Sequence, residues 1–151
     1  MTGYFWEISP DECGHLLADA AVGRVAWASS RGVQVLPVTL TSVGESVFFA
    51  VDQQSILAEL AEGVDAVVQV DDLDPETATG WSVLARGRTT RHEGPRPALN
   101  PSWTPGERGV LVRLDVASLT GRSNVDSKRA SRSVRAPKRA VSPSSASTRP
   151  A

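Results

Sequence analysis

Short segments rich in β-branched residues recur through the first 120 residues of the chain, and turn-forming residues separate them. Such segments predict β-strands, and the short connections favour antiparallel pairing over the long crossovers of a parallel sheet. We expect strands at residues 22–28, 33–41, 46–51, 65–73, 81–93 and 110–119. The predicted fold class is therefore mainly β, an antiparallel barrel of five or six strands with two short helices.

Two further segments have the pattern of short helices. In SPDECGHLLADA, Ser9 is the expected N-cap and Pro10 takes the first helical position, ahead of apolar residues at helical spacing. ILAELAEG follows the strand at 46–51 and gives one or two helical turns that end at Gly63. Pro37 lies inside an expected strand, and because proline cannot donate to the ladder it predicts an edge or a bulge.

Charge divides the chain into a body and a tail. Residues 122–151 hold eight basic residues against one acid, whereas the first 121 residues hold eight arginines, no lysine and 16 acids. Apolar residues become scarce from residue 123 onward, so we expect a folded domain at 1–122 and a disordered basic tail at 123–151. The tail could make weak contacts with nucleic acid or an anionic surface, or it could simply be solvated.

Several protein classes are excluded by what the sequence lacks. No apolar run approaches the ~18 residues of a membrane span, and the acidic N-terminus has no basic stretch before an apolar one. Cys13 is the single cysteine, which excludes an intramolecular disulfide and a multi-cysteine metal site. Hydrolase, Walker and GxGxxG motifs are absent. We expect a cytoplasmic protein that is neither an NTPase nor a Rossmann enzyme.

Five segments occur in an order that resembles a known family. They are LLADAAVGRVAWA, VLPVTL, SVFFAVDQQSILAEL, DDLDPETATGWSVLARGR and WTPGERGVLVRLDVASLTGR. This order is similar to the pyridoxamine 5'-phosphate oxidase-like flavin-binding split-barrel family, in its compact actinobacterial form, over about residues 7–122. The resemblance implies a six-stranded split barrel, a homodimer with flavin sites at the subunit interface, and FMN or the deazaflavin F420 as cofactor.

The segment FFAVDQQSIL departs from the family pattern. Similar proteins read FRTxxGSKL there, and the arginine, hydroxyl residue and lysine hold the cofactor phosphate. In this chain Ala50, Val51 and Ile56 take those three places, and Ser55 remains. The loss of two charge-assisted hydrogen bonds would raise the dissociation constant of the cofactor by about two to four orders of magnitude if the two effects are additive. The helix N-terminus that remains stabilises a bound anion by only about 0.3 to 1 kcal/mol. We therefore predict a degraded phosphate site.

The resemblance also singles out residues on other strands. Trp81 and Ser82 are expected to line the flavin ring or the dimer interface, and the alternative is a tryptophan that only packs the barrel or the dimer seam. Pro37, Val38 and Thr39 match the strand whose backbone runs along the ring in similar proteins, although they also suit an ordinary core strand.

Two arginines, Arg24 and Arg88, lie on expected strands of the body. Either side chain could reach a phosphate from a neighbouring strand. The alternative is a solvated face or an ion pair, which is the commoner fate of a strand arginine.

Two functions, one enzymatic and one noncatalytic, are consistent with these observations. The first is a flavin or deazaflavin oxidoreductase, in which the barrel positions the cofactor and the cofactor carries the hydride chemistry. The second is a noncatalytic split-barrel homodimer that has lost the cofactor and acts as a binding or structural module. The GWSV and LPV segments favour the first function, and the missing arginine and lysine favour the second.

Overall fold

The computed structural model describes residues 5–101 and 109–125 of the 151-residue chain. Within these ranges the chain forms the helix α1 (Pro10–Asp19), the 3₁₀ helix η1 (Ile56–Glu62) and eight β-strands. The strands are β1 (Trp6–Glu7), β2 (Val22–Ser29), β3 (Gly32–Thr39), β4 (Thr41–Val43), β5 (Ser46–Val51), β6 (Asp65–Asp74), β7 (Thr79–Arg91) and β8 (Val110–Ser123). No helix in the described ranges is long and apolar enough to cross a membrane. The expected disordered tail lies outside the described residues from residue 126 onward.

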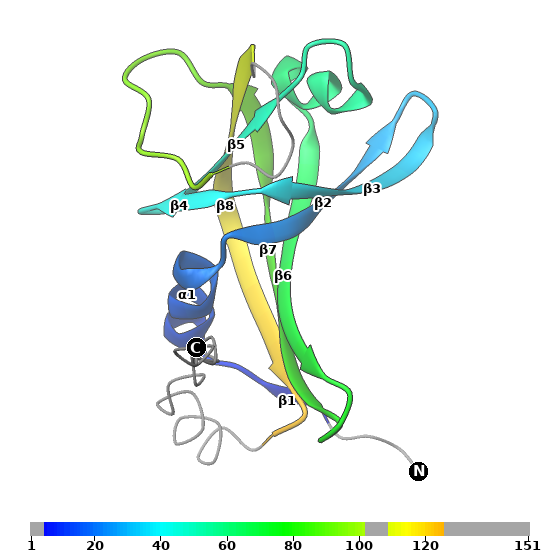
Figure 1. Cartoon of the computed structure of the whole chain (residues 1–151), viewed down its shortest axis with the longest axis vertical. Coiled ribbons are helices and arrows are strands. Elements are labelled where there is room, and N and C mark those ends of the chain that lie inside the picture. The colour runs from blue at the N-terminus through cyan, green and yellow to red at the C-terminus, as the bar shows by residue number, and fades with distance from the viewer. Residues whose placement is uncertain (1–4, 102–108, 126–151) are drawn as a thin grey trace, which may run out of the picture.

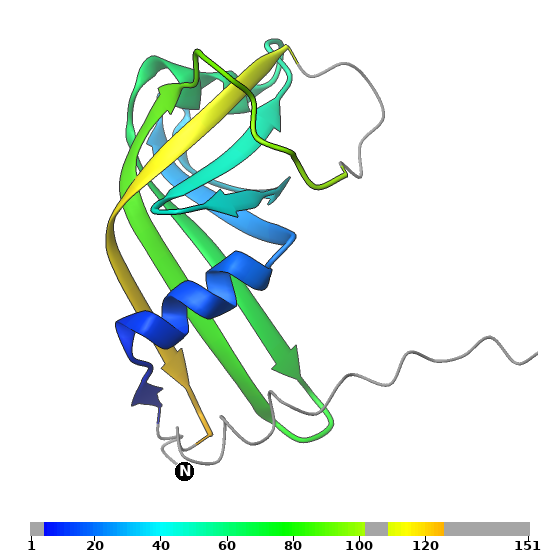
Figure 2. The ribbon, with the colours of Figure 1, turned by 90° about the vertical axis from the view of Figure 1, so that its left-hand side faces the viewer.

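The strands form one antiparallel sheet that closes on itself. Its order is β3-β2-β6-β7-β8-β5-β4, with β1 paired to β8. Strands β3 and β4 follow one another in the chain, yet β3 pairs with β2 and β4 pairs with β5, at opposite ends of this order. One bent strand therefore joins the two edges. If β3 and β4 count as one strand and β1 is set aside, the barrel has six strands, as predicted (Figures 1 and 2).

Leu40 forms the bend between β3 and β4. Its side chain is fully buried, and its backbone N–H donates to the carbonyl oxygen of Ala21 at 2.9 Å. Its own carbonyl oxygen accepts from Asn100 Nδ2 at 2.8 Å, and the Asn100 backbone N–H donates to Thr41 Oγ1 at 2.8 Å. Both backbone groups of Leu40 are thus satisfied at a point where the chain leaves one strand ladder and enters another.

Alternation along the strands separates the core from an outer face. On β2, Val25 and Trp27 are buried while Arg24 points outward, and on β6, Val68 and Val70 are buried with their neighbours on the opposite face. Burial of each such side chain contributes about 1.5 to 3 kcal/mol. The alternation therefore fixes which residues of β2, β6, β7 and β8 can meet a ligand or a partner on the outer face.

Both predicted helices are present at the ends of the barrel. Ser9 caps α1, accepting from the Glu12 backbone N–H at 3.2 Å, and Pro10 is the first helical residue, which confirms the prediction. In Figure 2, α1 crosses the lower part of the sheet formed by β6, β7 and β8. The second helix, η1, is 3₁₀ rather than α and ends at Gly63, whose φ of 88° suits glycine. Pro37 lies on β3, whose only ladder partner in the described residues is β2, which confirms the edge position.

Glu59 ties η1 to the hairpin of β2 and β3. Its carboxylate accepts from Trp27 Nε1 at 3.1 Å, from Ser29 Oγ at 3.2 Å and from Ser30 Oγ at 2.9 Å. These hydrogen bonds, that of Trp27 foremost, hold the pKa of Glu59 below its ordinary value, although partial desolvation opposes them. The charged carboxylate is thus the form that the folded state prefers.

Gly87 lies where the register of β7 against β8 shifts, next to Arg86. A Cβ atom at Gly87 would collide with the backbone carbonyl group of Asp115 on β8. The two strands approach too closely there for any other residue, so the irregularity in the ladder depends on this glycine.

We expect Gly87→Ala to lower the free energy of unfolding by about 2 kcal/mol or more, because the clash is with backbone that cannot move independently. Gly14→Ala is the matched control, since the nearest atom to its added Cβ is 4.0 Å away and α1 gains helix propensity. Urea denaturation of both variants measures the difference. Equal stability of Gly87→Ala and the wild type would contradict the close approach of β7 and β8.

A second prediction concerns pH. Because folding lowers the pKa of Glu59, its contribution is fully present above the ordinary glutamate pKa of about 4.3 and is lost as the pH falls through the lower folded-state pKa. Glu59→Gln should therefore melt below the wild type at pH 7, and the gap should close as the pH falls from about 5 towards 3. Glu62→Gln, an exposed change on the same helix, should show no such gap. A gap that is constant with pH would show that the charge of Glu59 is unimportant.

Candidate functional site

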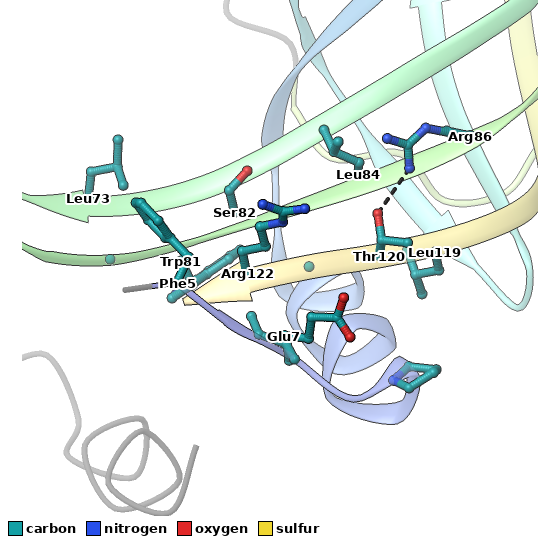
Figure 3. Close-up of a pocket in the computed structure, with 14 residues that line it drawn as sticks. Phe5, Glu7, Leu73, Trp81, Ser82, Leu84, Arg86, Leu119, Thr120 and Arg122 are labelled. Atoms are coloured by element: carbon teal, nitrogen blue, oxygen red, sulfur yellow. Dashed lines mark hydrogen bonds between the residues drawn. The ribbon is translucent and has the colours of Figure 1, made fainter. Parts of the chain in front are cut away.

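A groove of about 650 Å³ runs along the outer face of the sheet, over β7, β8 and β1 (Figure 3). Its position follows from strand alternation and register. Ser82 and Leu84 of β7 flank the buried Val83, and they pair with Arg122 and Thr120 of β8. The side chains that alternation turns away from the core on two neighbouring strands therefore line one hollow.

The apolar wall of the groove includes two aromatic side chains. Trp81 is half-buried and packs against the core as well as lining the groove, while Phe5 is 63% exposed. Leucine side chains complete this wall, namely Leu73, Leu84 and Leu119. The two uses expected for Trp81, packing and ligand contact, are thus compatible, because one edge of the indole can pack while the other faces the hollow.

The polar wall holds two arginines and one carboxylate. Arg86 Nη1 donates to Thr120 Oγ1 at 2.9 Å. Arg122 lies between Ser82 and Glu7 in the strand register, and its side chain makes no hydrogen bond or ion pair with any described residue. Two guanidinium groups against one carboxylate leave the groove with a net positive charge, which favours an anionic group.

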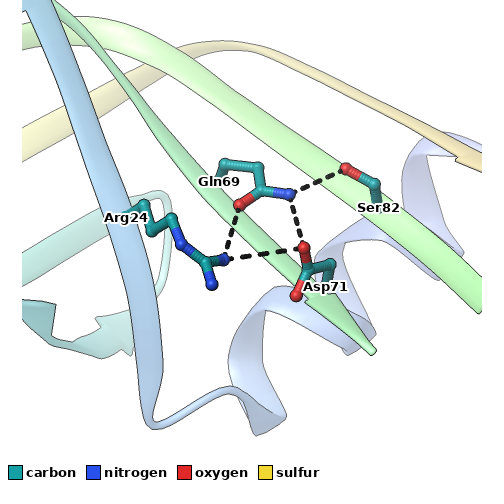
Figure 4. Close-up of polar contacts among 4 residues, drawn as sticks. All are labelled: Arg24, Gln69, Asp71 and Ser82. Atoms are coloured by element: carbon teal, nitrogen blue, oxygen red, sulfur yellow. Dashed lines mark hydrogen bonds and ion pairs between the residues drawn. The ribbon is translucent and has the colours of Figure 1, made fainter. Parts of the chain in front are cut away.

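A polar network beside the groove holds Ser82 in place (Figure 4). Gln69 Nε2 donates to Ser82 Oγ at 3.3 Å and to Asp71 Oδ2 at 2.8 Å. Arg24 Nη1 donates to Gln69 Oε1 at 3.4 Å and lies 3.6 Å from Asp71 Oδ2. The charge of Arg24 is therefore compensated by Asp71. Ser82, as the acceptor in its bond with Gln69, keeps its own proton to donate.

The junction between β5 and η1, expected to have held a phosphate, carries a carboxylate. Asp52 Oδ1 accepts the Gln54 backbone N–H at 2.9 Å, and Ser55 Oγ donates to the Asp52 carbonyl oxygen at 3.0 Å. The side chain of Asp52 thus takes up one of the amides that would face an anion, and its charge repels one. Sequence reasoning missed Asp52, although its position two residues before Gln54 suits such a turn.

The other expected junction residues serve the barrel. Val51 is fully buried in the core, Ile56 is partly buried against it, and Ala50 is half-buried on β5. The three residues expected along the flavin ring differ in exposure along β3: Val38 is buried, Thr39 is half-buried and Pro37 is exposed.

The expected site residues thus fall into separate groups. Ser82 and Trp81 lie at the lower end of β7, and Gln69 links Ser82 to Arg24, the strand partner of Pro37. The end of β5 and η1, which carry Ala50, Val51, Ser55 and Ile56, lie at the opposite end of the molecule (Figure 1). One copy of the chain does not bring the two groups together around a small ligand.

Sequence reasoning missed Arg86, Thr120 and Arg122. Arg86 could have been found, since it continues the two-residue spacing of Ser82 and Leu84 on one face of a strand. The chosen candidate, Arg88, instead donates to the Gly63 carbonyl oxygen at 3.0 Å and lies 3.6 Å from Asp65. Thr120 and Arg122 become neighbours of the groove only through the register of β8 against β7.

A second hollow of about 610 Å³ lies on the same face, over β2, β3, β6 and β7, and Arg86 lines it as well as the first groove. Small apolar side chains line it, among them Ala26, Ala28, Val33 and Val67. Val33 is 77% exposed, and Val35 beside it on β3 is 58% exposed. No group of three or more histidine, cysteine or acidic side chains among the described residues is placed to hold a metal ion. The outer face therefore offers an apolar surface and an arginine-lined groove.

Comparisons with known proteins agree with this fold. The Mycobacterium tuberculosis protein Rv0080 is 32% identical over 126 residues, which cover 76% of this chain and 82% of that protein. A Mycobacterium smegmatis FAD-binding protein superposes with a TM-score of 0.62 at 24% identity, covering 80% of this chain and 98% of that one. A second M. smegmatis structure, an FAD- and haem-binding protein, gives a TM-score of 0.60 at 15% identity, covering 95% and 93%.

The sequence itself identifies the family. Residues 9–123 match the pyridoxamine 5'-phosphate oxidase family, and this range runs from the N-cap of α1 to the last residue of β8. The chain belongs to the pyridoxamine 5'-phosphate oxidase-like family.

Proposed function

We propose that the chain binds a flavin or deazaflavin in the groove over β7 and β8, with the ring against Trp81, and works as an oxidoreductase. The observation that supports this proposal most is the groove itself. Its volume of about 650 Å³ lies within the usual 300 to 1,000 Å³ of small-molecule sites, and it combines apolar walls with a few polar groups. The M. smegmatis relatives that bind FAD, or FAD and haem, support a ligand of this class.

The residues of the groove suit the parts of such a ligand. Trp81 offers an aromatic face to a flat ring, an interaction worth about 0.5 to 1.5 kcal/mol beyond the buried area. Ser82 can donate to a ring acceptor from a fixed position, since Gln69 holds its oxygen. A bound flavin would supply hydride transfer, and the protein would supply binding, orientation and shelter from water. FMN and F420 remain the cofactors that the family pattern suggests, and FAD joins them through the relatives.

We further propose that two copies pair through the outer face of the sheet. Val33 pairs with Ala28 and Val35 with Ala26 across β2 and β3, and Ala26 also pairs with Val67 on β6. This apolar strip, which we define as Ala26, Ala28, Val33, Val35 and Val67, is contiguous across three strands, and Val33 and Val35 are its strongly exposed members. Its occupant in the proposal is a second copy, related by a two-fold axis, because the strip shares its face with the groove and the family pattern implies a dimer.

A specific observation favours the second function, a noncatalytic homodimer. Asp52 stands at the strand-to-helix junction where the family pattern has a cationic phosphate site, and Ala50 and Ile56 replace the cations. A chain that bound no cofactor would lose nothing by these changes. The measurement that separates the two functions is whether the purified protein binds a flavin.

Titration of the wild type with riboflavin, FMN, FAD and F420, followed by fluorescence, should give saturable binding of one or more of them. Trp81→Ala should weaken that binding about tenfold, through lost stacking and lost buried area. Trp6→Ala is the control, because this exposed indole on β1 does not line the groove. The absence of binding by all four ligands at about 100 μM would favour the noncatalytic function instead.

The double change Val33→Asp and Val35→Asp should convert a dimer into a monomer, because it places two carboxylates in the centre of an apolar interface. Val43→Asp is the matched control, since Val43 is 50% exposed but lies on β4, away from the apolar strip. Light scattering after size-exclusion chromatography measures the mass of each variant. A wild type that is monomeric at micromolar concentration would overturn the proposed dimer.

A further inference from the structure

We infer that the groove contains its own anion subsite, formed by Arg86, Arg122 and Thr120, and that it takes the phosphate of the bound ligand in place of the junction at Ser55. The inference rests on the proposed function, because it specifies which end of the groove receives which end of a flavin nucleotide. It assigns the charged group to β7 and β8, a position that the family phosphate pattern does not occupy.

The pairing of the other arginines leads to this assignment. On the outer face Arg24 is compensated by Asp71 at 3.6 Å and Arg88 by Asp65 at 3.6 Å, while Arg113 of β8, opposite Phe48 of β5, has Asp115 at 3.1 Å. Arg86 and Arg122 have no acidic partner among the described residues. Arg31, Arg91 and Arg96 also lack such a partner, but they do not line the groove, so the charges of Arg86 and Arg122 are the ones that can attract an anion there.

The positions of these groups suit a phosphate. Arg122 and Thr120 are two residues apart on β8, so both project from the same face of the strand. Arg86 reaches from β7 towards β8 and donates to Thr120 Oγ1 at 2.9 Å, the bond drawn as a dashed line in Figure 3. Each guanidinium group has five donors in a planar fork that matches phosphate oxygens, and Ser82, the strand partner of Arg122, adds a hydroxyl.

Glu7 carries the opposite charge to the two arginines, so its removal should change the affinity for an anionic ligand in the opposite direction. It lies on β1 as the strand partner of Arg122 and lines the same groove. Because its carboxylate repels a phosphate, its removal should strengthen the binding of an anionic ligand and leave a neutral one unaffected. A merely structural role of the groove would produce no such dependence on ligand charge.

The junction at Ser55, in contrast to the groove, offers little to a phosphate. Among the described residues, no arginine or lysine forms an ion pair or hydrogen bond with Asp52 or Ser55, and the Asp52 carboxylate adds a negative charge that already accepts from the Gln54 amide. The helix that follows is 3₁₀ and only seven residues long, so its N-terminus offers little to an anion. A ligand with one phosphate therefore gains more in the groove than at the junction.

The experiment compares riboflavin, which lacks the phosphate, with FMN, which carries it. Arg86→Gln and Arg122→Gln should each weaken FMN binding about tenfold or more and leave riboflavin binding within about threefold. Glu7→Gln should strengthen FMN binding about threefold. Arg31→Gln, an exposed change in the hairpin turn with the same loss of charge, should alter neither, and melting curves check that every variant is folded.

Two further experiments test where the phosphate binds. Inorganic phosphate at millimolar concentration should compete with FMN but not with riboflavin. The double change Ala50→Arg and Ile56→Lys, which restores the family cations at the junction, should leave FMN affinity within about threefold. A gain of about a hundredfold in that variant, or unchanged FMN binding by Arg86→Gln and Arg122→Gln, would overturn the inference. Failure of riboflavin, FMN, FAD and F420 alike to bind the wild type would instead overturn the proposed function itself.

Discussion

The bend at Leu40 is the constraint on which the rest of the structure depends. It allows one continuous segment to pair with β2 through β3 and with β5 through β4, so the two edge strands of the sheet are joined by the chain itself. Asn100 and Ala21 satisfy the two backbone groups at the bend, and the Leu40 side chain fills the core. Closure fixes the inner face as core, and it thereby leaves the opposite face of β2, β6, β7 and β8 available for the proposed contacts with a ligand and a partner.

Charge pairing then divides the outer face into two regions. Near β2 and β6, Arg24 and Arg88 are matched by Asp71 and Asp65, and small apolar residues lie between them. Near β1 and the lower part of β8, Arg122 has no acidic partner among the described residues. The first region suits a flat, largely apolar contact with another copy of the chain, and the second suits an anionic ligand.

Much of the fold could be predicted from the sequence, because period-two alternation and turn residues are local signals. Ser9 and Pro10 marked the start of α1, and Gly63 marked the end of η1. The expected strand at 33–41 contained the bend without revealing it, since nothing local to Leu40 shows that its two sides pair with different strands. The 3₁₀ geometry of η1 was likewise not predictable, because seven residues contain too few turns for the pattern to distinguish it from an α-helix.

The candidate site was predicted only in part. The GWSV motif located Trp81 and Ser82, but the groove also requires Thr120 and Arg122, which reach it through a register that shifts between Arg86 and Gly87. Strand register over that distance depends on tertiary packing rather than on local sequence. Asp52 escaped notice for a different reason: the family pattern drew attention to the residues that were missing from the junction and not to the carboxylate that was present.

In the proposed function, this barrel binds its ligand over β7 and β8 and holds the charged end at Arg86 and Arg122. A crystal structure of the protein with FMN tests it most directly. We predict the ring against Trp81, with phosphate oxygens about 3 Å from the guanidinium nitrogens of Arg86 and Arg122. A phosphate bound instead at the amides that follow Ser55, with the groove over β8 free of ligand, would contradict the claim.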